Sequence, residues 1–238
     1  MTPYLELFSS ADRERVVQCL KRADSRKEEL EVFLKAGNSC NVESLQIARL
    51  RGSNTLLHDT LKVETWNLAI KAVWGFIQEN RPPDLEAICE VNRILLGKLP
   101  GEPLIRKTKI SAEKVFPSPK KVELLLEDFN TQLGPILEHE HPLIQATWIY
   151  QTLVSIHPFE NANGRTSRLA ADWVLASKGF PPMVFLSPVA AMVPLDVECK
   201  QLDIKSRLTG ILRVTGAVGM AVKILTYIVC EKRNALND

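Results

Sequence analysis

The sequence predicts an all-α protein, a helical bundle built around a helix-loop-helix motif, with a small β-hairpin flap. Three observations carry this prediction. Apolar residues recur at helical spacing over most of the 238 residues. Glycines, prolines and capping residues divide these stretches into helices. One segment, residues 98–119, loses the helical period and carries four prolines beside a β-favouring run, which is typical of a loop with a short hairpin.

The composition excludes several classes of protein. The chain is 45% hydrophobic and 24% charged, with a net charge of +2 and no basic run, so neither disorder nor nucleic-acid binding is favoured. Five scattered cysteines without a C-x-x-C pair indicate neither a disulfide framework nor a structural zinc site. The N-terminus reaches acidic residues before any apolar run long enough for a signal peptide. We therefore expect a cytoplasmic protein, or one delivered without a signal peptide.

In the first third of the chain, capping residues and prolines set the expected helix bounds. Residues 11–36 predict one or two surface helices that end at Gly37. Residues 42–80 predict two helical stretches broken near residues 51–54, before Arg81-Pro82-Pro83 ends the second. Asp84 is expected to cap a helix that reaches Gly97. The second stretch carries a stripe expected to be buried: Leu56, Leu57, Leu61, Val63, Leu68, Ala69, Val73 and Phe76.

Helical patterning returns after the hairpin segment. We expect a helix over residues 120–138, a second after His141-Pro142 that runs to residue 156, and a third from Arg165 to Gly179. His139 and His141 are two residues apart and do not share a helical face, which disfavours a metal site. Residues 208–230 are apolar enough for a membrane span. Arg213 and Lys223 interrupt them at a cost of about 2.5–3.5 kcal/mol each at a bilayer centre, so we expect a buried terminal helix.

The candidate site is the segment HPFENANGRTSR, residues 157–168, which joins two predicted helices. His157 can act as a base near neutral pH, and Phe159 can anchor the loop by burying its ring. The small residues Ala162 and Gly164 let a phosphate approach the backbone N–H groups. Arg165 and Arg168 lie three residues apart at a helix start, so both can reach an anion there. The segment is therefore expected to handle phosphate groups.

This segment resembles the signature of the Fic family, H-x-F-x-(D/E)-G-N-(G/K)-R-x-x-R. The matches are His157, Phe159, Asn163, Gly164, Arg165 and Arg168, whereas Asn161 stands at the acidic position and Ala162 at the first glycine. Residues near Arg106 are loosely similar to the family's flap, which holds a target segment by strand addition. The resemblance covers roughly residues 55–190. It implies a core domain there, an N-terminal helical region at 1–54 and a C-terminal helical extension at 191–238 packed on the core.

The resemblance implies protein adenylyltransferase activity. A serine, threonine or tyrosine hydroxyl of a target protein, deprotonated by His157, would attack the α-phosphate of ATP. The implied nucleotide-binding residues are Phe159, Ala162, Asn163, Gly164, Arg165 and Arg168. The implied partner is the target protein, with no nucleic acid and no membrane, and a homodimer is an open alternative.

The family resemblance also implies Mg²⁺, but a neutral amide at position 161 is a poor ligand for a hard cation. Three accounts remain open. Asn161 can bind Mg²⁺ weakly while the triphosphate supplies the charge, or Glu160 can take its place. In the third account the enzyme uses another phosphate-containing donor. A competing class is a degenerate Fic fold that binds nucleotide or a partner without turnover.

Upstream, residues 60–67 resemble the family's self-inhibitory (S/T)-x-x-x-E-(G/N) helix. The resemblance implies that Thr60 and Glu64 are inhibitory residues, with Glu64 paired to Arg168 in place of a nucleotide phosphate. Thr65 departs from the usual glycine or asparagine. The alternative is that Glu64 is an ordinary solvated helix residue.

Overall fold

The computed structural model describes residues 3–38, 40, 45, 60–100, 102, 104–108, 116–184 and 204–234. Within them the protein is all-α, as the sequence predicts, and the β structure is one isolated bridge between Ile105 and Phe159. The helices are α1 (Pro3–Glu6), α2 (Ser10–Lys35), α4 (Thr60–Gln78), α5 (Leu85–Leu96), α6 (Pro119–His139), α7 (Pro142–Ile156), α8 (Asn163–Ser177) and α9 (Ile204–Asn234).

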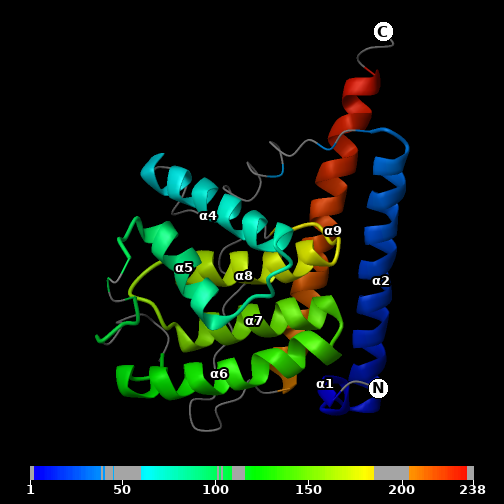
Figure 1. Cartoon of the computed structure of the whole chain (residues 1–238). Coiled ribbons are helices and arrows are strands. Elements are labelled where there is room, and N and C mark those ends of the chain that lie inside the picture. Colours follow the sequence, from blue (N-terminus) through cyan, green and yellow to red (C-terminus); the bar gives the residue numbers. More distant parts are fainter. Residues whose placement is uncertain are drawn as a thin grey trace.

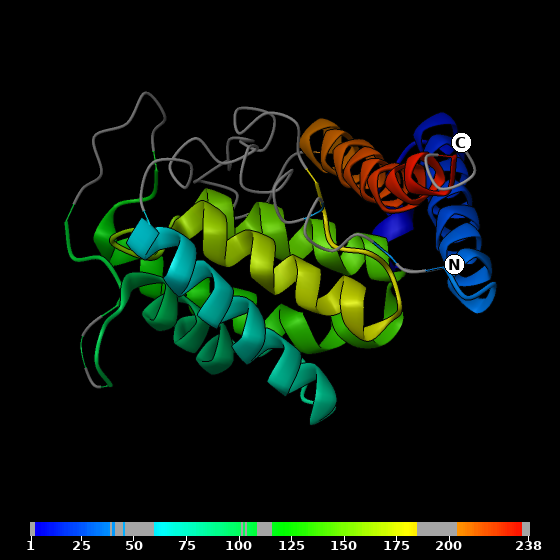
Figure 2. The same ribbon diagram turned by 90° about the horizontal axis from the view of Figure 1, so that it is seen from above.

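Helices α4 to α8 form a bundle with α7 and α8 at its centre, and α2 and α9 stand side by side along one edge (Figure 1). The view from above shows the same two helices together at one side of the bundle, with α9 next to the central pair and α2 farther out (Figure 2). Almost every residue of α7 is buried. A helix that is apolar all round belongs in a core, so α7 is the element around which the others pack.

Local capping signals set several helix ends where the sequence predicts them. Residues 11–36 form the single helix α2, whose N-cap Ser9 accepts a hydrogen bond from the Asp12 N–H. Asp84 caps α5, because its Oδ1 accepts from the Ala87 N–H at 2.7 Å, and Gly97 ends that helix with φ +63°. The other ends lie within a few residues of the prediction: α4 stops at Gln78, before the prolines, and α8 begins at Asn163 rather than Arg165 and ends at Ser177.

A second core cluster lies between α4, α5 and α8, and its largest members are Trp66 and Trp173. The buried stripe predicted for α4 is right at Ala69 and Val73 but wrong at Leu68, which is 55% exposed. Leu56 and Leu57 lie outside the described residues, as does the Leu61 side chain. The buried Trp66, Ala69 and Val73 recur at helical spacing on the face that packs in this cluster, and Leu68 lies off that face.

Besides its apolar packing, helix α2 makes polar and aromatic contacts with the start of α7 and with Phe180. His141, the N-cap of α7, accepts the Leu143 N–H with Nδ1 and meets Asp24 of α2 with Nε2 at 3.1 Å. Lys27 of α2 lies over the Phe180 ring, 5.2 Å from its centroid. His141 therefore serves helix capping and helix docking.

One helix in the described part of the chain is long and apolar enough to cross a membrane. This is α9, whose Ser206–Thr226 segment has a mean hydropathy of 1.5. Half of that segment is buried, through packing against α2 and α7. This packing supports the expectation of a buried terminal helix. The division into regions at residues 1–54, 55–190 and 191–238 stays a prediction.

The packing of α9 on α7 depends on a glycine. A Cβ at Gly210 would fall well inside van der Waals contact of the Gln151 side chain, which is 2% exposed and donates to the Ser206 carbonyl at 2.9 Å. Gly216, on the same helix, has nothing within 4 Å of an added Cβ.

We predict that Gly210→Ala lowers the free energy of unfolding by about 1–3 kcal/mol, because Gln151 must move and lose its bond to Ser206. Gly216→Ala is the matched control, and it should raise the free energy by about 0.5–1 kcal/mol through helix propensity alone. Urea denaturation of both variants checks this. Equal effects of the two substitutions would contradict the packing described.

Candidate active site

The candidate segment forms the turn between α7 and α8. Residues 157–162 connect the two helices, and both ends of this loop are left-handed, with φ +52° at His157 and φ +61° at Ala162. Non-glycine residues rarely adopt this conformation, which costs roughly 1–2 kcal/mol. The backbone does not favour this loop conformation by itself, so other contacts must stabilise it.

Asn163 supplies one of these contacts. Its side-chain amide accepts from the Phe159 N–H at 2.9 Å and donates to the Phe159 carbonyl at 2.8 Å. Both polar groups of the buried Asn163 amide are thus used to close the loop, with the Phe159 ring fully buried below it. This geometry gives Asn163 a loop-shaping role, and the predicted contact of its side chain with phosphate stays untested.

Asn92 of α5 supplies another contact that the sequence does not reveal. Its buried amide donates to the Asn161 carbonyl at 3.1 Å and to the Thr166 hydroxyl at 2.9 Å. The Thr166 hydroxyl in turn donates to the Ala162 carbonyl at 3.0 Å. A buried asparagine in an amphipathic helix is the only sequence signal for this contact, and it does not name the partner 69 residues away.

His157 is placed to act as a base. It is half-buried, its ring packs against Phe116 with centroids 4.1 Å apart, and its Nδ1 lies 3.3 Å from the Val154 carbonyl. A carbonyl can only accept, so Nδ1 carries the proton and Nε2 of the neutral ring keeps its lone pair. The pKa of His157 is lowered, mainly because burial disfavours the charged ring. The Arg106 charge also lowers this pKa, whereas the hydrogen bond to Val154 raises it. The lowered pKa favours the neutral ring as the predominant form at pH 7.

The first turn of α8 follows the loop that begins at this base. The Thr166 N–H is bonded back to the Ala162 carbonyl, whereas the N–H groups before it have no acceptor within the helix. Arg165 is buried and Arg168 is half-buried on the same helix. Backbone N–H groups, the helix dipole and two guanidinium groups all favour an anion at this end. A base thus lies close in the chain to a place suited to phosphate.

The predicted inhibitory residues lie on α4, which packs against α8. Arg168 lies over the Trp66 ring, 5.7 Å from its centroid, so α4 does approach the arginine. Glu64, two residues before Trp66, is exposed. Thr60 begins α4, but its side chain lies outside the described residues. Pairing of Glu64 with Arg168 stays a prediction.

The two candidate metal ligands are already engaged. The Asn161 Oδ1 accepts from the Ala162 N–H at 2.7 Å, and the exposed Glu160 carboxylate pairs with Lys98 at 3.1 Å. The described residues contain no group of three or more His, Cys, Asp or Glu that could hold a metal ion. In this arrangement the loop does not fit a protein-held Mg²⁺, and no step below is assigned to a metal.

Ala162 departs from the glycine of the family signature, and the structure gives a physical reason why this is tolerated. Its left-handed backbone costs roughly 1–2 kcal/mol relative to glycine. Its methyl group is buried in the cluster around Trp173, where one methyl contributes about 0.8 kcal/mol. Burial therefore offsets much of the backbone cost.

Comparison with known proteins agrees with these observations. Residues 82–175 match the model of the Fic/DOC family. The chain is 33% identical over 149 residues to a uridine 5'-monophosphate transferase of Xanthomonas campestris pv. campestris, covering 55% of this chain and 28% of that protein. It is 32% identical over 124 residues to a protein adenylyltransferase Fic of Drosophila persimilis, covering 50% and 24%. The chain thus spans about a quarter of the length of these relatives.

The fold also has a solved counterpart. A Fic domain-containing signalling protein of Bacteroides thetaiotaomicron matches with a TM-score of 0.57 and 16% identity, covering 94% of each chain. At this identity the match shows the Fic fold alone. Together with the family match, it means that this chain carries a Fic/DOC family domain, which includes His157, the loop and most of α8.

Proposed function

We propose that the protein transfers a nucleoside monophosphate, with AMP from ATP as the first candidate, to a hydroxyl group of a target protein. One observation carries the proposal: the His157 ring, with its Nδ1 turned to the Val154 carbonyl at 3.3 Å, stands in the loop that leads into the anion-favouring end of α8. A module that only binds nucleotide does not need such a base. Two of the relatives named above support the proposal, since one is a uridine 5'-monophosphate transferase and the other a protein adenylyltransferase.

The proposed step is a displacement at the α-phosphorus. The target hydroxyl gives its proton to Nε2 of His157, and its oxygen forms a bond to the α-phosphorus while the bond to the pyrophosphate oxygen breaks. Pyrophosphate leaves with the electron pair of that bond. Arg165 and Arg168 would hold the β- and γ-phosphates and stabilise the charge on the leaving group. His157 later returns the proton to solvent.

UMP from UTP is the second candidate donor group, because the Xanthomonas relative is a uridine 5'-monophosphate transferase. The two candidate donors, ATP and UTP, differ only in their nucleobase. The phosphate-handling residues proposed above serve both donors equally.

A donor comparison tests the proposal. Purified protein is incubated with cell lysate and either α-labelled ATP or α-labelled UTP, with and without a chelator, and labelled proteins are separated by gel. Wild type should label at least one protein with one donor, and His157→Asn should not. A Glu64→Gln variant with more label than wild type would support inhibition by Glu64. No label with either donor in any variant would reject nucleotidyl transfer.

The pKa of His157 predicts how transfer depends on pH. The base form is the neutral ring, and burial moves its pKa below the ordinary value of 6.5. The rate of transfer should therefore be close to its maximum at pH 7 and should fall with a midpoint below pH 6.5, as the ring is protonated through its lowered pKa. Initial rates between pH 5 and 8 check this. A midpoint above pH 7 would contradict the burial and hydrogen bonding described.

A further inference from the structure

The most deeply buried charge near the site belongs to Arg106, at the start of the predicted flap. Arg106 is 2% exposed. We define the flap ends as residues 104–108 and 116–117, on either side of residues 109–115, which lie outside the described part of the chain. A buried guanidinium is costly unless its N–H groups are satisfied, so its partners show what it holds together.

The partners of Arg106 come from two places. Within the flap ends, its guanidinium donates to the Thr108 carbonyl at 3.2 Å and to the Pro117 carbonyl at 2.5 Å. At the end of α7, the guanidinium donates to the His157 carbonyl at 2.6 Å and to the Ile156 carbonyl at 3.5 Å. One side chain thus joins the beginning and the end of the flap to the residue that carries the base.

The two active-site carbonyls are at the C-terminus of α7, where helix carbonyls have no intrahelical partner and the helix dipole is negative. A cation is favoured there. The guanidinium also has five N–H donors in a fixed planar fork, so it can satisfy several carbonyls at once, which the compact ammonium of lysine cannot. Arginine is therefore specifically suited to this position.

Three further contacts join the flap ends to the loop. The Arg106 N–H donates to the Pro158 carbonyl at 2.9 Å, and Ile105 pairs with Phe159 in the isolated bridge. Phe116, at the other flap end, packs on the imidazole of His157. Both flap ends therefore contact the loop within two residues of the base.

We propose that Arg106 is the positioning residue for His157, and that it ties the flap ends and the base into one unit. Loss of the guanidinium would remove the hydrogen bonds to the C-terminal carbonyls of α7 and to the Pro117 carbonyl. The left-handed His157 and the second flap end would then lose the same support. The effect on transfer rests on the proposed function, whereas the effect on the ring of His157 does not.

The first test compares Arg106→Gln and Arg106→Lys with Arg13→Gln. Arg13 is a matched control, because its guanidinium also donates to backbone carbonyls, those of Leu5 and Phe8, away from the site. The titration of His157 is followed by NMR of histidine-labelled protein, with its signal assigned from His157→Asn. Transfer is measured per folded protein.

Arg106→Gln should raise the midpoint of the His157 titration, because a nearby positive charge is lost, and should lower transfer by about 10²-fold through misplacement of the base. Arg106→Lys should keep a midpoint near that of wild type but still lose transfer, since one ammonium cannot hold both flap ends. Arg13→Gln should change neither. If both Arg106 variants matched Arg13→Gln in midpoint and transfer, Arg106 would be a stabilising residue only.

A measurement on the wild-type chain covers the case in which the variants do not fold. Native-state hydrogen exchange should show the Arg106 N–H, bonded to Pro158, and the Phe159 N–H, bonded to Asn163, opening in one step with similar protection. Rapid exchange at Arg106 beside a strongly protected Phe159 would overturn the proposal. This result does not depend on any activity, so it separates failure of the proposal from failure of the proposed function.

Discussion

Replacement of His157 by asparagine should lower transfer by about 10²–10⁴-fold, the usual contribution of a positioned general base. Asparagine is the right substitution because His157 has φ +52°, and asparagine tolerates this left-handed conformation better than alanine does. The variant therefore removes the ring without straining the end of α7. Rates of label transfer at saturating donor concentration give the effect on kcat, and rates at limiting donor concentration give the effect on kcat/KM.

His139→Asn is the matched control for this prediction. His139 ends α6 with more than half of its side chain exposed, and its nearest charge is the neighbouring Glu138. It should keep the transfer rate of wild type. Transfer by His157→Asn within tenfold of wild type would mean that His157 is not the base.

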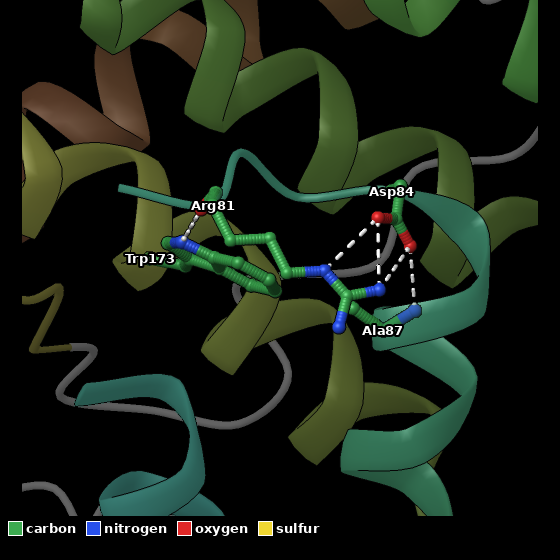
Figure 3. A network of polar contacts seen from close by, with 4 residues as sticks. All are labelled: Arg81, Asp84, Ala87 and Trp173. Atoms are coloured by element: carbon green, nitrogen blue, oxygen red, sulfur yellow. Dashed lines mark hydrogen bonds and ion pairs between the residues drawn. The ribbon is translucent and has the colours of Figure 1, made fainter. Parts of the chain in front are cut away.

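Trp173→Ala should lower the free energy of unfolding by about 3–5 kcal/mol, as for other fully buried aromatic residues. Trp173 is fully buried in α8 and stacks on Phe76 of α4, with ring centroids 4.9 Å apart. Its Nε1–H donates to the Arg81 carbonyl at 3.1 Å, and Arg81 pairs with Asp84, the cap of α5 (Figure 3). Loss of the indole leaves a cavity between three helices and an unsatisfied carbonyl.

Two substitutions separate these causes. Trp173→Phe keeps an aromatic ring but loses the hydrogen bond, and it should cost about 1–3 kcal/mol. Trp74→Ala removes the same side chain from a position on α4 that is 53% exposed, and should cost less than either Trp173 variant. Chemical denaturation of the three variants gives the order. A cost for Trp173→Ala no larger than that for Trp74→Ala would contradict the packing of α4 and α5 on α8.

The sequence predicts the helices well where a local signal sets their ends. Asp84 and Gly97 act within one helix turn, so their effect on α5 can be read without knowledge of the fold. Burial within α4 was harder to predict. Several apolar faces can be drawn on this helix, and the structure buries the one that carries Trp66, Ala69 and Val73, which leaves Leu68 exposed.

The site shows the same division between local and distant information. The motif and its spacing identify the loop between α7 and α8, and the family resemblance supplies the proposed roles. Neither shows that Asn92 and Arg106 hold the loop from other elements, 69 and 51 residues away along the chain. Nor do they show that Asn161 turns its oxygen to the Ala162 N–H. Such contacts depend on how the helices pack, which a single sequence does not specify.

The position of the label in the donor tests the central claim most directly. Wild-type protein and lysate are incubated with the preferred nucleotide, labelled in one reaction at the α-phosphorus and in another at the γ-phosphorus. Displacement at the α-phosphorus predicts that wild type labels protein more strongly than His157→Asn with the α-labelled donor alone. The γ-label leaves in pyrophosphate, and kinases of the lysate add γ-label equally in both samples. A γ-label that wild type adds beyond His157→Asn, or equal α-labelling by the two, would contradict nucleotidyl transfer by this site.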